Sequence, residues 1–178
     1  ARCAGVTVCR WRGPWTCDPR ADVFFRVASV PNWCEDRLEV RGPADDLRRF
    51  YDQAKGPEPT NGEKPELLCF NNFVPRPPEP IPSPDHMPGW WHWCIQNWGT
   101  KWEPNEVNVV SGSIEEEVVV YDFMTAWSPP CPAVAAMAKQ FPTLHFVLRY
   151  REPGIGFEGI FEVEGENVEQ DVQREVLF

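Results

Sequence analysis

Apolar and charged residues alternate over residues 32–41, and this pattern predicts a strand with one buried side. Cys34, Leu38 and Val40 share one face of that strand, and Asp36 interrupts the face near its start. A strand of this kind packs one side on the core and leaves the other in water. The largely charged side carries Trp33, Glu35, Arg37, Glu39 and Arg41.

A helical period replaces the alternation after Gly42 and predicts a helix over residues 43–55. Pro43 suits the first helical position, and the acidic pair Asp45 and Asp46 suits the positive end of the helix dipole. The apolar stripe that would face the core consists of Leu47, Phe50, Tyr51 and Ala54.

The same two periods predict the remaining elements. A short Trp-rich helix is expected over 90–98, and a second main helix follows the Pro cluster at 129–132 and ends near Phe141. The acidic, weakly patterned segment from Glu164 is interpreted as a frayed helix. Strands are expected over 66–73, 106–114, 117–127, 143–151 and 157–163.

The order of these elements predicts the fold class. Two strand–helix–strand units with further antiparallel strands form an α+β fold with helices packed against a sheet. We therefore predict a ferredoxin-like α+β sandwich, an antiparallel sheet with two main helices and an inserted Trp-rich short helix. The term "ferredoxin-like" names a topology only and does not imply an iron–sulfur cluster. An iron–sulfur cluster needs four convergent cysteines, usually closely spaced, and no cysteine pair in this sequence has the Cys-x-x-Cys spacing.

Four short motifs rich in Trp, Asn and Pro are spread along the chain. They are Pro31-Asn32-Trp33-Cys34, Asn71-Asn72-Phe73-Val74-Pro75, Asn97-Trp98-Gly99-Thr100-Lys101-Trp102 and Thr125-Ala126-Trp127-Ser128-Pro129-Pro130. Their order and spacing resemble a family of small bacteriophage- and plasmid-borne proteins, the YubB-like family with a ferredoxin-like domain. The resemblance covers most of residues 30–165, and it implies this fold and an origin in a mobile element. It implies no activity, because the family has no established one.

Residues 1–29 differ in composition from the rest of the chain. They hold five Arg against two Asp, three of the seven Cys, and no Lys, Glu or Met. Members of the resembled family begin with Met directly before Pro-Asn-Trp-Cys. This chain has Val30 there, and a bacterial GTG codon can initiate translation. We therefore expect translation to start at Val30 and residues 1–29 to be a non-native or disordered leader. A ferredoxin-like domain over 30–165 and an acidic C-terminal tail over 166–178 would follow.

Composition and charge limit the number of domains, the binding partners and the compartment that we expect for the protein. A chain of 178 residues suits one domain, and nine Trp with eleven Phe supply ample core material. The formal charge of −10 works against broad attraction to phosphate backbones. The sequence has no apolar run long enough to cross a bilayer. Seven cysteines, an odd number, are typical of reduced thiols. We expect a protein of the bacterial host-cell cytoplasm.

Two patterns suggest binding chemistry, and we interpret both as structural. The string Gly154-Ile155-Gly156-Phe157-Glu158-Gly159 matches a dinucleotide fingerprint, but the residues after it alternate like a strand, which favours a hairpin turn. His86, His92 and Cys94 suggest a metal site, but His92 and Cys94 are two positions apart on a predicted helix and point apart. His145 is expected on the outward face of its strand. We predict no metal ion and no cofactor.

Cys34 could act as a nucleophile with a distant histidine. The charges nearest to it in sequence are acids, and an activated thiol needs the opposite surroundings. A buried, unreactive thiol is therefore the favoured interpretation.

The residues of the Trp and Asn motifs form the one remaining candidate site. Neutral amides and hydroxyls among large aromatics could line a pocket, with Lys101 for an acidic group. The same residue types also describe a core in which Trp N–H and Asn groups satisfy one another, which is the interpretation we favour. The candidate pocket residues are Asn71, Asn72, Asn97, Trp98, Thr100, Lys101, Trp102, Thr125, Trp127 and Ser128.

Three classes of function follow from these observations. The leading expectation is a non-enzymatic binding module that engages a host or mobile-element protein. The second is a small-molecule or nucleotide-processing enzyme that uses the Asn, Trp and Lys101 residues. The third is a single-stranded nucleic-acid binder that stacks bases on an open sheet face, which the net charge opposes.

Overall fold

One antiparallel sheet organises the part of the chain that the computed structural model describes, residues 31–56 and 66–176 of the unit Pro31–Phe178. Its six strands lie in the order β2-β3-β1-β4-β5-β6. The expected leader over 1–29 and the expected start at Val30 lie outside the described residues. The strands are β1 Trp33–Arg41, β2 Asn105–Ser113, β3 Val118–Ala126, β4 His145–Glu152, β5 Phe157–Glu164 and β6 Asn167–Glu175. The helices are α1 Ala44–Ala54, the 3₁₀ helix η1 Phe70–Asn72, α2 Gly89–Trp98 and α3 Cys131–Gln140.

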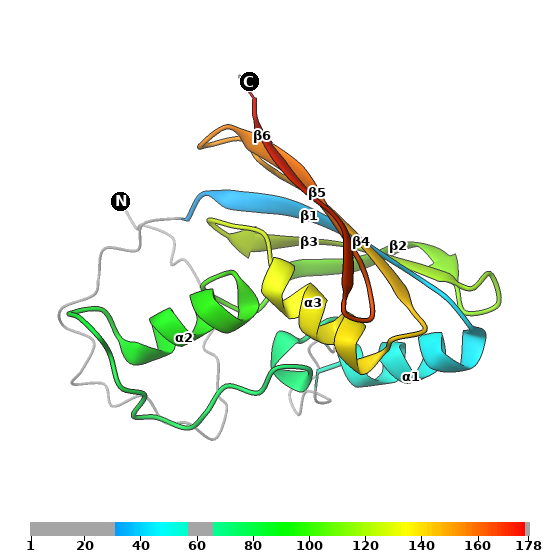
Figure 1. Cartoon of the computed structure of the whole chain (residues 1–178), viewed down its shortest axis with the longest axis horizontal. Coiled ribbons are helices and arrows are strands. Elements are labelled where there is room, and N and C mark those ends of the chain that lie inside the picture. Colours follow the sequence, from blue (N-terminus) through cyan, green and yellow to red (C-terminus); the bar gives the residue numbers. More distant parts are fainter. Residues whose placement is uncertain (1–30, 57–65, 177–178) are drawn as a thin grey trace, which may run out of the picture. The chain divides into compact units, whose positions relative to one another are not determined.

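The connections between the strands give the sheet its ferredoxin-like topology. The units β1-α1-β2 and β3-α3-β4 interleave, because β1 pairs with β3 on one side and with β4 on the other. Hairpins then add β5 and β6 beyond β4. The helices lie on one face of the sheet, as Figure 1 shows. The predicted α+β class with an antiparallel sheet is confirmed.

The strand predicted over residues 66–73 is wrong. The segment contains no strand and forms a loop followed by η1. Its apolar side chains are nevertheless buried: the Phe70 ring lies 6.1 Å from that of Trp98, and the Phe73 ring lies 5.4 Å from that of Phe50. A short apolar run without alternation fits a strand or a buried turn equally well. The second strand of the first unit is therefore β2, and the connection from α1 to β2 carries η1 and α2.

The frayed helix predicted from Glu164 is also wrong. Residues 167–175 form β6, which pairs with β5 along its length. The sheet therefore continues past the boundary at 165 that the sequence suggested. Nearly every residue of β6 is exposed, so the strand needs no alternating apolar face.

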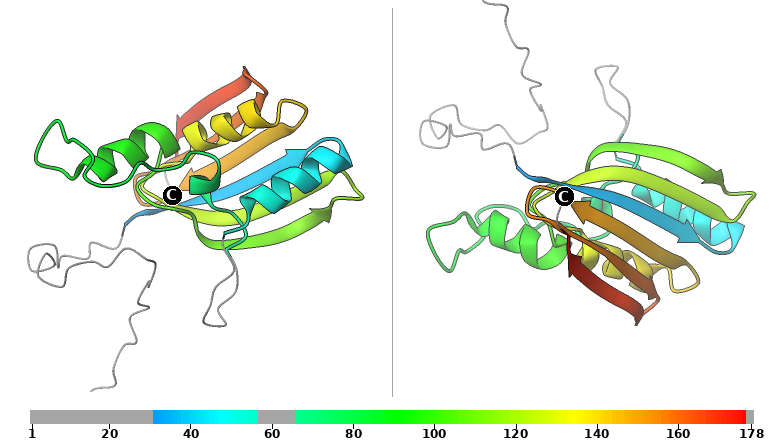
Figure 2. Two further views of the ribbon diagram at one scale, coloured as in Figure 1. Left: turned by 90° about the horizontal axis from the view of Figure 1, so that it is seen from below. Right: turned by 90° about the horizontal axis from the view of Figure 1, so that it is seen from above.

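The core lies between the helices and the face of the sheet that they cover (Figure 2). Leu38 of β1, Leu148 of β4 and Phe161 of β5 are neighbours across that face, and all three are buried. Phe50 of α1 lies at the centre of an aromatic cluster, because its ring contacts those of Phe73, Tyr121, Phe141 and Phe146. The alternation in β1 thus predicts the buried face correctly.

The glycine string starts in the turn between β4 and β5 and continues into β5, and the hairpin interpretation is confirmed. Gly156 has a φ of 92°, a left-handed conformation that glycine adopts easily. The buried Glu152 carboxylate accepts hydrogen bonds from the backbone N–H groups of Gly154 and Ile155. The string therefore serves the turn and is not followed by a helix.

Candidate functional site

The structure brings together only some of the ten residues of the Trp and Asn motifs, near the end of α2 and the turn after β3. Thr100 Oγ1 donates to the Ala126 carbonyl at 3.0 Å, and Ser128 Oγ donates to the Gly99 carbonyl at 2.6 Å. Trp98 Nε1 donates to the Val74 carbonyl at 2.9 Å. These bonds tie separate segments together and satisfy main-chain carbonyl groups.

The remaining motif residues also make local contacts. Asn72 Nδ2 donates to the carbonyls of Gln53 and Lys55, at the end of α1, and Asn97 Nδ2 donates to the Trp93 carbonyl. Asn71 Oδ1 accepts from the Arg76 N–H. The Lys101 ammonium lies 4.3 Å from the centre of the Trp102 ring. Trp127 has a φ of 74° at the turn between β3 and α3. Neither of the two cavities described below is lined by any of the ten.

One residue of the same motif region, Glu103, has a role that the sequence did not reveal. Its carboxylate accepts hydrogen bonds from the N–H groups of Phe70 at 2.6 Å and Asn71 at 2.9 Å. It therefore caps the first turn of η1 from a segment more than thirty residues away. Burial raises the pKa of Glu103, and the two N–H donors oppose that shift.

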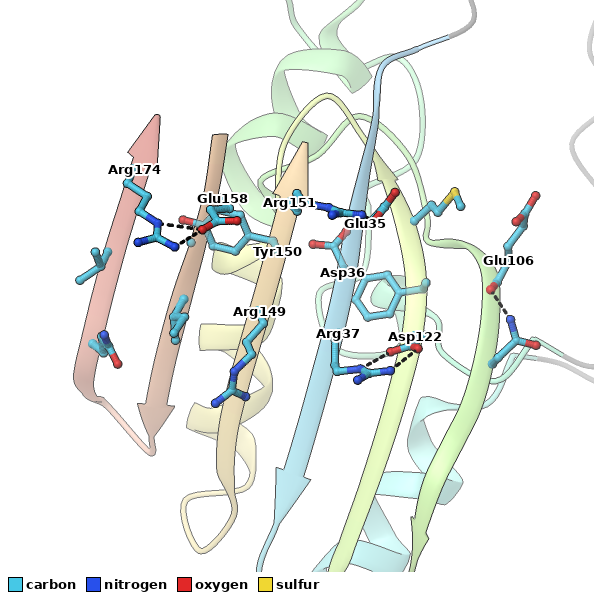
Figure 3. Close-up of a pocket in the computed structure, with 17 residues that line it drawn as sticks. Glu35, Asp36, Arg37, Glu106, Asp122, Arg149, Tyr150, Arg151, Glu158 and Arg174 are labelled. Atoms are coloured by element: carbon cyan, nitrogen blue, oxygen red, sulfur yellow. Dashed lines mark hydrogen bonds and ion pairs between the residues drawn. The ribbon is translucent and has the colours of Figure 1, made fainter. Parts of the chain in front are cut away.

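The face of the sheet that the helices leave open carries a groove. Its volume is about 820 Å³, and its walls come from all six strands. Figure 3 shows its charged side chains projecting from neighbouring strands. A smaller depression of about 420 Å³ lies between the Pro-rich segment and α2. The lining of the groove includes four arginines, Arg37, Arg149, Arg151 and Arg174, and five acids, Glu35, Asp36, Glu106, Asp122 and Glu158.

Ion pairs join most of the arginines of the groove to carboxylates on adjacent strands (Figure 3). Arg37 of β1 donates two hydrogen bonds of 2.7 Å to Asp122 of β3. Arg151 of β4 donates to Glu35 at 2.5 Å. Arg174 pairs with Glu158 between β6 and β5. Bidentate geometry of the Arg37–Asp122 type fixes the direction of both side chains, so these pairs give the open face a defined charge pattern.

Arg149 differs from the other arginines of the groove. It lies between Arg37 and Ile160 in the strand register and is exposed, and its guanidinium donates no hydrogen bond to any residue in the described part of the chain. An arginine presents five N–H donors in a planar fork that matches a carboxylate. Arg149 therefore offers an unused donor set at the centre of the groove. The alternation in β4 places it outward, which is the signal that sequence analysis left unused.

The covered face behind the groove holds a buried polar cluster around Asp36. Thr125 Oγ1 lies 2.6 Å from Asp36 Oδ2 and 2.9 Å from the Ser128 carbonyl, and the Cys34 thiol donates to Asp36 Oδ1 at 3.8 Å. The threonine hydroxyl has one proton, so both short contacts are satisfied when Asp36 is protonated and donates to Thr125. Burial raises the pKa of Asp36, which favours that arrangement.

The thiols of the described residues have the properties expected of buried cysteines. Burial raises the pKa of Cys34 above its usual value. Burial also raises the pKa of Cys69 to about 12, and that of Cys131 to about 12. A reactive cysteine needs a lowered pKa. The interpretation of Cys34 as an unreactive buried thiol is therefore supported.

The comparison with known families concerns the second half of the chain. Residues 97–178 match the family model of the ferredoxin-like domain in Api92-like protein. The match begins at the end of α2 and takes in β2 to β6, whereas β1 lies before it.

A solved structure shares this architecture. The crystal structure of a protein Api92 from Yersinia pseudotuberculosis superposes with a TM-score of 0.56 over 82% of this chain and 98% of that chain. The sequences are 11% identical, so the likeness concerns the fold alone. A search of curated proteins gives no match. In the described part of the chain, each helix is too short or too polar to span a bilayer.

Proposed function

We propose that this protein is a non-enzymatic binding module, and that it engages a host or mobile-element protein through the open face of its sheet. The groove of about 820 Å³ on that face carries the proposal. Grooves that combine ordered polar groups with accessible apolar surface are preferred places for binding. The apolar part of this groove includes Met124, Ile160 and Val172.

The charge of the groove favours a protein over a nucleic acid as the partner. Its four arginines face five acids, of which Asp36 is buried, so positive and negative groups are nearly balanced. Binding to a phosphate backbone draws its energy from an excess of Lys and Arg. A protein surface with both signs of charge is the better complement, and such complementarity selects the partner and its orientation.

The origin in a mobile element and the bacterial cytoplasm are parts of this proposal that rest on the YubB-like resemblance of the Trp and Asn motifs. The enzymatic alternative, which would use Lys101 and the neighbouring Asn and Trp residues, is less favoured. Most of those side chains donate to main-chain carbonyls or pack on one another.

The test is quantitative co-purification of the tagged full chain from a bacterial host, with mass spectrometry of the bound proteins. Arg149→Glu reverses the charge at the centre of the groove, and Arg48→Glu makes the same change on an exposed position of α1. We expect one protein at near-equal stoichiometry with the wild type, retained by the Arg48 variant and reduced at least about tenfold by the Arg149 variant.

Equal recovery of that protein by both variants would contradict the proposed surface. Recovery of nucleic acid in place of a protein, detected by ultraviolet absorbance of the eluate, would contradict the proposed class of partner.

A further inference from the structure

Three oxygen- and nitrogen-bearing side chains converge on the open face at the end of the sheet where β4 begins. His145 Nε2 of β4 lies 3.0 Å from Glu162 Oε1 of β5 and 3.6 Å from Glu169 Oε2 of β6. One ligand atom from each residue lies within 4.8 Å of the others. The three strands are hydrogen-bonded neighbours, so the convergence is built on a rigid element.

A β-bulge brings Glu169 into this group. Glu162 pairs with Gln170, whereas the next residue, Val163, pairs with Val168. Glu169 is thus the extra residue of β6 opposite that step. A bulge re-aims a side chain that the regular alternation would direct elsewhere, and here it turns the Glu169 carboxylate toward His145. Regular pairing would supply only two of the three donors.

The donor set has the chemistry of a metal site. A neutral imidazole nitrogen either donates one proton or offers one lone pair, so His145 Nε2 serves one carboxylate well and not both. A cation between the three groups satisfies all of them. Bonds of about 2.0–2.2 Å from imidazole nitrogen and carboxylate oxygen to the ion place such donors about 3–4 Å apart, which is close to the observed spacing.

The surroundings are compatible with a cation. Arg41 lies opposite His145 in the strand register. Its Nε donates to Glu39 at 2.6 Å, so the positive charge of Arg41 is neutralised by an acid of the same strand. The side chains of His145 and Glu162 are 27% and 26% exposed, and that of Glu169 is 51% exposed. The site is therefore half-sheltered with one open side, where water would complete the coordination.

We propose that His145, Glu162 and Glu169 form a binding site for a divalent first-row transition-metal ion such as Zn²⁺ or Co²⁺. One imidazole with two carboxylates suits these borderline ions. The prediction of no metal considered the three histidines along the chain, where no acid stands at ligand spacing. It did not consider acids from neighbouring strands. The proposed site is independent of the partner-binding groove.

The test uses the full chain after treatment with a chelator. Titration with Co²⁺ is followed by visible absorption, which reports the coordination of the ion, and by the near-ultraviolet band that thiolate ligands would add. Zn²⁺ affinity is measured by calorimetry. We expect one Co²⁺ site without the thiolate band. We also expect His145→Ala and Glu169→Gln each to weaken binding at least about tenfold.

His92→Ala is the matched control, because His92 Nε2 lies 2.8 Å from a single carboxylate, that of Asp85, and is not part of the three-donor group. It should bind metal like the wild type. The exposed Glu169→Gln change removes a ligand with little risk to folding, which circular dichroism checks. Absence of Co²⁺ and Zn²⁺ binding by the wild type, a thiolate band, or unchanged affinity in both ligand variants would overturn the proposal.

Discussion

Charged residues have different surroundings on the two faces of the sheet. On the covered face, Asp36 is 3% exposed, and its neighbours are a hydroxyl and a thiol. On the open face, Arg37 and Asp122 are 56% and 37% exposed and pair with each other. The two sets alternate along the same strands, one residue apart. Position relative to the helices, and not residue type, therefore decides how each charge is satisfied.

This difference implies that the covered face determines stability and the open face determines binding. Burial of a charged carboxylate is costly, so the covered face favours the neutral, hydrogen-bonded form of Asp36. Exposed ion pairs contribute little to stability because water and salt screen them. Changes on the covered face should therefore affect unfolding, and changes on the open face should affect binding.

The largest expected effect is a difference in stability between variants of two adjacent residues of β4. Leu148 is fully buried between Leu38 and Phe161, whereas Arg149 points to the open face. Leu148→Ala should lower the free energy of unfolding by about 2–5 kcal/mol, because it removes apolar contacts and leaves a cavity. Arg149→Ala should change it by less than about 0.5 kcal/mol. Urea unfolding followed by tryptophan fluorescence measures both. Similar losses in the two variants would contradict the division between the faces.

The next effect concerns the pH dependence of stability at Asp36. Because its pKa is raised in the folded protein, the folded state holds a proton that the unfolded state releases above its ordinary value of about 3.9. The stability from this group is thus complete at lower pH and is lost as pH rises toward the folded pKa. Each unit of difference contributes about 1.4 kcal/mol.

Asp36→Asn keeps the shape of the side chain and cannot ionise. It should match the wild type in acid and exceed its stability near neutral pH, as urea unfolding over a pH series would measure. Asp122→Asn removes a carboxylate from the open face instead and should give no such gain. A wild type that gains stability relative to Asp36→Asn as pH rises would show that Asp36 is buried as a carboxylate.

The smallest expected effect is the coupling between Arg37 and Asp122. Their geometry is bidentate, but both side chains are more than a third exposed. A double-mutant cycle with Arg37→Ala and Asp122→Ala should give a coupling energy of about 0.2–1 kcal/mol, falling with added salt. A coupling several times larger and insensitive to salt would show that an open-face ion pair stabilises the fold, which would contradict the division between the two faces.

Local patterns predict much of this fold. The alternation in β1 and the stripe of Leu47 and Phe50 in α1 identify buried residues correctly, because each pattern reports one face of one element. The run from Leu68 to Phe70 misleads because burial in a loop that leads into a 3₁₀ helix leaves no period. The segment of β6 misleads because an exposed edge strand has no buried face to mark it.

Residue patterns within single elements predict the α+β class, the covered and open sides of β1, and the turn at Gly156. The strand order, which sets Arg149 between Arg37 and Ile160, and the bulge that turns Glu169 toward His145 emerge only from the folded sheet. The reason is physical. Periodicity records how a segment meets water and core, whereas the groove and the three-donor group depend on which distant segments share hydrogen bonds.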